Sequence, residues 1–313
     1  MTLPRSDGPL FIVINAGSGA RHASEIQPKI AALLGAADRA HRFLPAHGGG
    51  VVAAARQAVA LAREQQGVVV AAGGDGTINA VAQAVIGAGL PFAVLPQGTF
   101  NYFGRTHGIP QETEAAVRAL LSAELRPVQA GLVNDRLFLV NASLGLYPTL
   151  LEDREAYKRQ LGRSRPVALL AGLVTLLRER RQLDLCIELE GETVCLRTPT
   201  LFVGNNRLQL DQIGIAEAPA LEAGRLVAIM LRPIRGLSML GLLLRGALGR
   251  LGEAETVTSF CLRQLTVRTP RQRRIKVAAD GEVFHLRSPL QFRVAPQPLL
   301  LMVPRPDQRV EPA

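Results

Sequence analysis

An apolar run, Val68–Ala72, ends in the residues Gly73–Thr77 (GGDGT) and leads directly into a stretch with helical periodicity, Thr77–Ile86. A strand that passes into a helix through glycines leaves several backbone N–H groups directed at one point. The start of the helix adds the positive end of its dipole. Such a turn suits phosphate oxygens. It also limits the fold, because this connection belongs to sheets in which strands alternate with helices.

The same arrangement occurs a second time, where the apolar run Pro91–Leu95 ends in Pro96–Asn101 (PQGTFN). Either turn alone is consistent with an ordinary strand-to-helix connection. The pair is more informative, because ligands of open α/β sheets bind at the carboxyl ends of the strands. Together the turns predict a nucleoside triphosphate site, with four polar side chains at the strand ends: Asp75, Thr77, Thr99 and Asn101.

Strands and helices alternate through the first 125 residues. The pattern predicts strands at Leu10–Ile14, Ala40–Leu44, Val68–Ala72 and Phe92–Leu95, and helices at Ala23–Leu34, Val51–Glu64, Thr77–Ile86 and Glu112–Leu121. Such a repeat calls for a parallel sheet covered by helices on both faces. We therefore assign residues 1–125 to a nucleotide-binding α/β domain.

The pattern changes near Arg126, where short alternating strands become dominant. Hairpin-turn signals at Asn134-Asp135 and Glu190–Glu192 indicate antiparallel pairing. We assign 126–298 to an antiparallel β domain with two helical insertions, Glu152–Arg181 and Ile234–Leu251. Its predicted strands are Gln129–Val133, Arg136–Ala142, Asp184–Glu190, Thr193–Arg197, Leu201–Gly204, Gly224–Leu231, Glu255–Val267 and Ile275–Ala279.

The 313 residues, 48% of them hydrophobic, are enough for two domains with buried cores. The longest strongly apolar run, Val167–Leu177, is too short to span a bilayer, and we expect no signal peptide. The cysteines lack metal-ligand spacing and show no paired framework, so we expect free thiols in a reducing compartment: Cys186, Cys195 and Cys261. These features predict a cytoplasmic protein.

The net charge of +10 comes almost wholly from arginine, which can also reflect genomic base composition. Basic residues cluster at 154–165 and 268–276, and such clusters attract nucleic acid or anionic lipid headgroups. Tryptophan is absent and there are three tyrosines, so surfaces for base stacking are scarce. We therefore expect a lipid partner and no nucleic acid. The segment Glu152–Arg181 either contacts an anionic membrane peripherally, at its inner face, or packs on the β domain. Homodimer formation stays open.

Five segments, in this order, resemble the catalytic domain of the diacylglycerol kinase family, which includes bacterial soluble lipid kinases, sphingosine kinases and ceramide kinases. The Gly-Asp-Gly-Thr element alone is shared with NAD kinases and phosphofructokinases. The later Gly-Thr-Phe-Asn and Asp-Gly-Glu elements narrow the resemblance to the lipid kinases. The segments are Asn15–Gly19, Gly73–Asn79, Pro96–Asn101, Asn141–Gly145 and Asp280–Glu282.

The resemblance implies an NAD kinase- or phosphofructokinase-like α/β domain followed by a β-sandwich, with 299–313 holding a strand, Leu299–Val303, that returns to the first domain. It implies ATP and Mg²⁺ as cofactors. Asp280 and Glu282 would be catalytic, and the spacing leaves open which one is the base; Asp280-Gly281 is also a common hairpin turn. Asp75 either contacts ATP-bound Mg²⁺ or caps the following helix. The implied nucleotide ligands are Asn15, Ser18, Gly73, Gly74, Asp75, Gly76, Thr77, Asn79, Gly98, Thr99 and Asn101.

The chain also departs from the family pattern. Ala80 and Tyr102 replace the usual acidic residues, and Ala223-Gly224 stands where many bacterial members have an Asp-Gly that contributes to a structural magnesium site. The leading hypothesis is an ATP-dependent kinase of a diacylglycerol-like or other long-chain lipid. The alternatives are a soluble-substrate kinase of the NAD kinase type and a non-catalytic relative that binds nucleotide or lipid.

Overall fold

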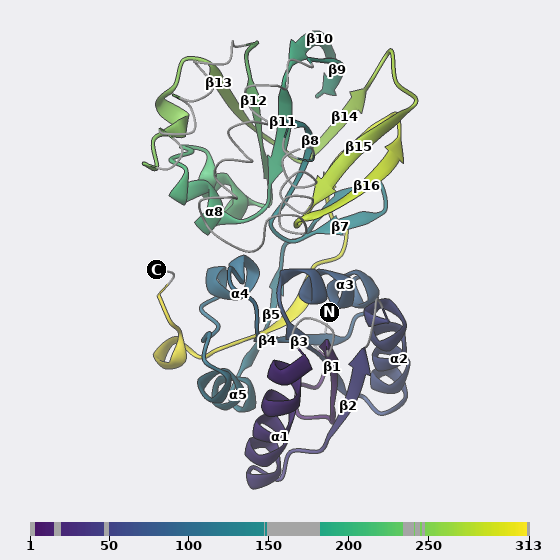
Figure 1. The fold of residues 1–313 in the computed structure, drawn as a ribbon, viewed down its shortest axis with the longest axis vertical. Helices are drawn as coiled ribbons and strands as arrows, with labels where there is room; N and C mark the ends of the chain where they lie inside the picture. Colours follow the sequence, from purple (N-terminus) through teal and green to yellow (C-terminus); the bar gives the residue numbers. More distant parts are fainter. Residues whose placement is uncertain are drawn as a thin grey trace. The chain divides into compact units, whose positions relative to one another are not determined.

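The chain forms two units, one built on a mostly parallel sheet and one on two antiparallel sheets (Figure 1). The first unit contains Met1–Ala130 and Ala295–Ala313, and the second contains Gly131–Val294. The computed structural model describes residues 4–15, 20–46, 50–146, 148, 182–233, 241, 245 and 248–311. The predicted insertion Glu152–Arg181 and most of Ile234–Leu251 lie outside these residues, as does Ser18.

The sheet of the first unit has the strand order β2-β1-β3-β4-β18-β5. Neighbouring strands are parallel except β5, which runs antiparallel to β18. Every residue of β3, β4 and β18 is buried, as expected for strands covered on both faces. The strands are β1 (Leu10–Asn15), β2 (His41–Ala46), β3 (Val68–Gly73), β4 (Pro91–Pro96), β5 (Glu124–Val128) and β18 (Leu299–Val303).

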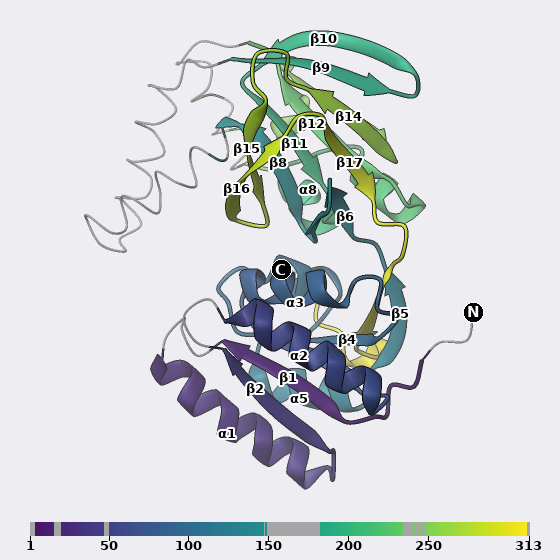
Figure 2. The same cartoon turned by 90° about the vertical axis from the view of Figure 1, so that its right-hand side faces the viewer.

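Helices cover both faces of this sheet (Figure 2). On one face, α1 and α5 pack on β1, β3 and β4 through side chains such as Ile30 and Val117. On the other face, α2 and α3 pack together through buried alanines and Ile78. The α/β fold predicted from the sequence is therefore confirmed. The helices are α1 (Ala20–Ala36), α2 (Val51–Glu64), α3 (Asp75–Val85), α4 (Tyr102–Thr106) and α5 (Thr113–Leu121).

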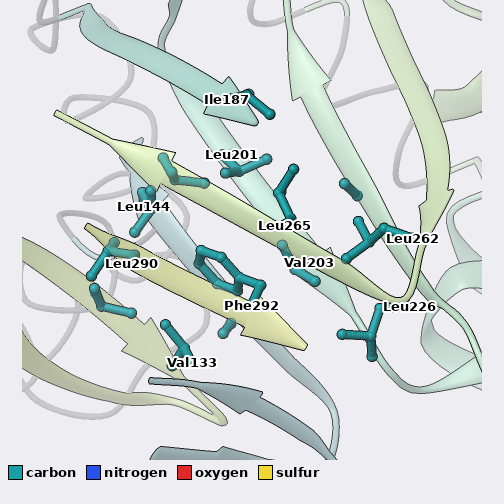
Figure 3. Close-up of a cluster of buried hydrophobic side chains, with 14 of the residues drawn as sticks. Val133, Leu144, Ile187, Leu201, Val203, Leu226, Leu262, Leu265, Leu290 and Phe292 are labelled. Carbon is teal, nitrogen blue, oxygen red and sulfur yellow. The ribbon is translucent and has the colours of Figure 1, made fainter. Parts of the chain in front are cut away.

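The second unit is a sandwich of two antiparallel sheets, with strand orders β10-β9-β14-β17-β6-β7 and β13-β12-β11-β8-β15-β16. Figure 3 shows the apolar side chains between them, among them Leu144, Leu201 and Phe292. The predicted β-sandwich is confirmed. Its strands are β6 (Gly131–Val133), β7 (Arg136–Phe138), β8 (Asn141–Gly145), β9 (Leu183–Leu189), β10 (Glu192–Thr198), β11 (Thr200–Gly204), β12 (Leu226–Leu231), β13 (Val257–Leu262), β14 (Gln264–Arg268), β15 (Arg274–Ala279), β16 (Glu282–Arg287) and β17 (Leu290–Val294).

Four short helices complete the described part of the chain. They are the α-helix α8 (Arg207–Gln212) and the 3₁₀ helices η1 (Ala218–Ala223), η2 (Leu251–Glu253) and η3 (Pro306–Gln308). Among the helices in the described residues, none has the length and apolar character needed to cross a membrane.

Two predicted strands are each two strands in the structure. Arg136–Ala142 is interrupted between β7 and β8 at Leu139 and Val140, whose N–H groups bond to the side chain of Asp280 instead of a neighbouring strand. Glu255–Val267 changes sheets at Arg263, so that β13 and β14 belong to different layers. Both sides of that break are apolar and face the core, and the hydrophobic pattern therefore does not reveal it.

The prediction of three free thiols is wrong. Cys186 and Cys195 form a disulfide, and Cys261 is the free cysteine. The two bonded residues lie directly opposite each other in the β9–β10 hairpin, whose turn is Glu190-Gly191. The predicted hairpin already placed the two cysteines on facing strands. That cross-strand pairing was the sequence signal for the disulfide. The cysteine content therefore does not support a reducing compartment.

Candidate functional site

The first predicted phosphate turn joins β3 to α3. Gly74 is the N-cap residue of α3, with φ −82° and ψ −178°, and the first hydrogen bond of the helix runs from Ile78 N to Gly74 O over 3.0 Å. The N–H groups of Gly76 and Thr77 precede that bond and lie at the positive end of the helix dipole. A Cβ atom on Gly73 would stand 2.6 Å from the Cβ of Thr77. The turn therefore requires glycine there.

The second turn, Pro96–Asn101, is held in shape by the buried side chain of Asn101. Its Oδ1 accepts a hydrogen bond from Gly98 N at 3.0 Å, and its Nδ2 donates to Gly98 O at 2.8 Å and to Gln111 Oε1 at 2.6 Å. Asn101 has φ +46° and is the N-cap residue of α4. The side chain of Asn101 therefore holds the loop in shape, and its predicted role as a nucleotide ligand stays a prediction. Thr99 is exposed, with no hydrogen-bond partner among the described residues.

The two turns pack against each other backbone to backbone. A Cβ atom on Gly98 would stand 2.8 Å from the Cα of Gly74, and one on Gly74 would stand 3.3 Å from the Cα of Gly98. Gln97 N donates to Gly73 O at 2.9 Å. The predicted pair of glycine turns is thus one continuous backbone surface at the ends of β3 and β4.

Asp75 links the two turns. Its Oδ2 accepts a hydrogen bond from Asn101 N at 3.0 Å, and its Oδ1 is buried without a hydrogen-bond partner in the described part of the chain. Burial raises the pKa of this carboxyl group, against the opposing effect of backbone hydrogen bonds from Asn101 and Tyr102. No side chain caps α3, so the capping role left open for Asp75 is not the one observed.

Two more predicted ligands lie beside this surface. Asn15, at the end of β1, donates from Nδ2 to the Oγ1 of Thr77 at 3.4 Å, and Thr77 is buried. Asn79 lies partly buried on the first turns of α3. The first unit therefore brings the ends of β1, β3 and β4 together around the start of α3.

The predicted catalytic residue Asp280 lies in the second unit, in the tight turn between β15 and β16. Both turn residues have positive φ, +46° at Asp280 and +86° at Gly281, as a two-residue hairpin requires. The Asp280 carboxylate accepts three backbone hydrogen bonds, which occupy three of its roughly four acceptor positions. The donors are Leu139 N at 2.7 Å, Val140 N at 2.9 Å and Asn141 N at 3.0 Å.

Glu282 is the first residue of β16 and pairs with Ala279 in the ladder. Its side chain is exposed, and its carboxylate has no hydrogen bond or ion pair within the described ranges. The two predicted catalytic carboxylates therefore differ: that of Asp280 holds a loop, and that of Glu282 is exposed.

A buried polar cluster behind the Asp280 turn was not predicted. Asn205 Nδ2 donates to Leu139 O at 3.0 Å, and Asn141 Nδ2 donates to Gln209 Oε1 at 3.0 Å. Asn206 is fully buried and caps α8 by accepting from Gln209 N at 3.0 Å. The sequence signal for this cluster was the pair Asn205-Asn206, directly after the predicted strand Leu201–Gly204. Polar residues at the end of a buried strand indicate a site.

Residues 9–133 match the diacylglycerol kinase catalytic domain. This match covers less than half of the chain. A probable lipid kinase YegS-like of Klebsiella pneumoniae is 37% identical over 98 residues, covering 30% of this chain and 33% of the relative. One of Pseudomonas aeruginosa is 49% identical over 79 residues, covering 25% and 26%. The matched stretches thus span a third or less of these two relatives.

The fold extends over nearly the whole chain. The crystal structure of a putative diacylglycerol kinase from Bacillus anthracis superposes with a TM-score of 0.70, at 19% sequence identity, and the match covers 96% of this chain and 98% of that one. At this identity, the likeness establishes the shared fold and no more.

Proposed function

We propose that the chain is an ATP-dependent lipid kinase that transfers the γ-phosphoryl group to a hydroxyl of a diacylglycerol-like or other long-chain lipid. The observation that carries this proposal is the backbone surface of the two glycine turns, with the unpartnered Oδ1 of Asp75 beside it. The catalytic-domain family and the relatives described as probable lipid kinases support the reaction class.

In this proposal the triphosphate is held mainly by backbone. The N–H groups of Gly76 and Thr77 and the exposed hydroxyl of Thr99 donate to phosphate oxygens, while Asn101 keeps the second turn in shape. Positioning and charge neutralisation are the main requirements of phosphoryl transfer. A rigid backbone surface meets the first requirement without reorganisation.

The residues present fit a magnesium ion that enters with ATP. Carboxylate oxygen is a preferred magnesium ligand, and the Oδ1 of Asp75 has the free acceptor capacity. When bound, the ion would supply charge neutralisation at the β- and γ-phosphate oxygens. Asp75 would contact it directly or through water, while its Oδ2 stays bonded to Asn101 N.

We assign the general base to Glu282. A base has to take the proton of the lipid hydroxyl, and a carboxylate already accepting three N–H bonds is a poor candidate. Glu282 is exposed and carries no such bonds, whereas Asp280 fixes the turn from which Glu282 projects. Asp280 is then a positioning residue.

The test is phosphate transfer from labelled ATP in the presence of mixed membrane lipids. We expect a phosphorylated lipid from the wild type, a loss of at least ~10²-fold in kcat for Glu282→Gln, and unchanged ATP affinity. Glu192→Gln is the matched control, because Glu192 is also an exposed first residue of a strand after a tight turn. Transfer to NAD in place of lipid would favour a kinase of the NAD kinase type. Bound ATP without any transfer would favour a non-catalytic relative.

We also propose that the protein works at an anionic membrane surface, from the sequence of the segment Glu152–Arg181. Attraction between its arginines and anionic headgroups should weaken as salt rises. Co-sedimentation with anionic vesicles should fall with added salt and with the triple change Arg159→Gln, Arg163→Gln and Arg165→Gln. Binding indifferent to both would assign the segment to packing on the β domain.

A further inference from the structure

The first unit contains a cavity whose lining includes no residue of the two glycine turns. This cavity of about 480 Å³ lies where the end of α4, strand β5 and the segment after β18 meet. Its lining includes Thr106, His107, Gly108, Arg126, Arg309 and Glu311. None of these residues has a role in the proposed phosphoryl transfer.

Hydrogen bonds hold the segments that form the walls of this cavity in place. The segment after β18 is fixed by a hydrogen bond from Val310 N to Gly108 O at 3.1 Å and by one from Ser122 Oγ to Gln308 Oε1 at 2.6 Å. Arg309 Nε donates to Pro304 O at 3.0 Å. The stem of Arg309 lies so close to Gly108 that a Cβ atom there would meet the Arg309 Cβ at 3.0 Å.

Positive charge collects around the cavity. Arg126 forms an ion pair with Glu124 at 3.0 Å, and its hydrogen bond is the largest of the effects that lower the pKa of Glu124. Arg305 and Arg309 add to that lowering, so three guanidinium groups lie near one carboxylate. Glu311, on the lining, is the second acidic group. On the lining itself, Arg126 and Arg309 stand against the one carboxylate of Glu311, which leaves one positive charge in excess.

Two uncharged groups on the lining complete the set. The Oγ1 of Thr106 is buried and has no hydrogen-bond partner among the residues the structure describes. His107 packs edge-on against Phe103, with ring centroids 4.8 Å apart. Burial, with a smaller contribution from the charge of Arg309, lowers the pKa of His107 to about 4, so the imidazole is neutral at pH 7. The cavity thus places arginine side chains beside a threonine whose buried hydroxyl has no partner in the described chain.

Guanidinium forks and hydroxyl donors together are the chemistry that recognises phosphate oxygens. A cavity of this size takes a small molecule or the headgroup of a larger one. We propose that the cavity is an effector site that binds a phosphate-bearing anion, either a free phosphate compound or a phosphomonoester headgroup, and changes nucleotide affinity.

The link to the glycine turns is the five-residue helix α4. It ends at Thr106, on the cavity, and its N-cap residue is Asn101, whose N–H bonds to Asp75 and whose side chain shapes the second turn. A helix of this length is only ~7.5 Å long, and its residue Arg105 donates from its backbone N to Asn101 O at 3.0 Å. A shift of Thr106 on anion binding therefore reaches Asn101. The effector role rests on the proposed nucleotide site. Anion binding in the cavity does not depend on that site.

The test uses the ring resonances of His107, because an anion in the cavity favours the imidazolium form and raises its pKa. We expect inorganic phosphate to raise the His107 pKa in the wild type and also in Gly74→Val. A response in Gly74→Val would show that phosphate binds in this cavity and not at the glycine turns. In the double variant Arg126→Gln/Arg309→Gln, phosphate should no longer move the pKa. The matched control Arg56→Gln/Arg118→Gln removes two exposed arginines elsewhere in the unit and should respond as the wild type does.

The variants should fold, because exposed ion pairs such as Arg126–Glu124 contribute little to stability. Arg126→Lys/Arg309→Lys, which keeps both charges and loses the forks, gives a second measure and should respond weakly. Phosphatidylcholine vesicles with phosphatidic acid form the lipid arm. A response to phosphate identifies a free anion, and a response to these vesicles alone identifies a headgroup. No His107 shift in either arm overturns the site, and a shift that leaves the ATP Kd unchanged overturns the effector role.

Discussion

Two Asp-Gly pairs of the chain lie at the end of a strand, and their aspartate carboxylates differ in hydrogen bonding. At Asp75-Gly76, between β3 and α3, Oδ2 accepts a hydrogen bond from Asn101 N, and Oδ1 is buried without a hydrogen-bond partner in the described chain. At Asp280-Gly281, between β15 and β16, three N–H groups meet the carboxylate. The first Asp has spare capacity for a ligand, and the second has almost none.

This difference teaches that a motif locates a site while the surroundings assign the role. Both pairs were predicted as parts of one phosphoryl-transfer site. The bonding pattern makes Asp75 a candidate ligand and Asp280 a scaffold for the neighbouring Glu282. The following predictions test the contrast, beginning with the largest expected effect.

Gly74→Val tests whether the first turn is a ligand surface. The added side chain starts 3.3 Å from the Cα of Gly98, so the two turns have to separate. Overpacking of this kind costs about 1–3 kcal/mol, and we expect the ATP Kd to rise by at least ~10²-fold. Calorimetric titration measures it. Gly35→Val is the control, because nothing lies near a Cβ atom on Gly35. Equal ATP affinity in both variants would remove the turn from consideration.

Asp280→Asn tests the scaffold. The amide keeps one oxygen and turns an NH₂ group toward a backbone N–H, so at least one charge-assisted bond is lost and another group is left unpaired. We expect about 2–3 kcal/mol less unfolding free energy, measured from urea denaturation. Glu282→Gln, two residues along, should change stability by less than about 0.5 kcal/mol while removing turnover. A stable Asp280→Asn protein without turnover would return Asp280 to the role of base.

Elements of the fold were predicted correctly where the sequence has a clear periodic pattern. In the first unit, the apolar strands and amphipathic helices repeat strongly, and α2 begins and ends at the predicted residues Val51 and Glu64. Helix α4 has five residues, too few for periodicity to show. In the second unit, β16 and β17 were missed and the change of sheets at Arg263 left no trace in the pattern.

The part of the candidate site that is formed by backbone could be predicted from the sequence. Glycines after buried strands located both turns, and the structure places the strand-end residues Asn15 and Thr77 beside them. What the sequence could not provide was the partner of each polar group. Asn101 bonds to Gly98 and Gln111, and Asp280 bonds to amides more than a hundred residues away. Such long-range partners depend on the assembled fold.

Asp75→Asn should act in the opposite direction to Asp280→Asn. Burial raises the Asp75 pKa above its unfolded value, so stability from this group is present below the unfolded pKa and is lost as pH rises through the folded pKa. The amide variant lacks this loss. At pH 7 we expect its unfolding free energy to equal or exceed that of the wild type by up to about 1 kcal/mol, with weaker dependence on pH in the acid range. Denaturation at several pH values measures it, and a clear destabilisation at pH 7 would contradict the assignment.

The smallest effect is expected from metal removal. The resemblance places a structural magnesium ligand of many relatives at Ala223, whose side chain has no oxygen. The neighbouring carboxylates of Glu222 and Asp211 both form ion pairs with Arg207, and no group of metal-binding side chains occurs among the described residues. EDTA should therefore shift the Tm of the nucleotide-free protein by less than about 1 °C, because an ion that does not bind cannot stabilise the fold. Ala223→Asp is the matched variant: the restored carboxylate should make its Tm rise with Mg²⁺. A Tm that falls on chelation in the wild type would show that an ion is bound without a carboxylate at 223, and would contradict this prediction.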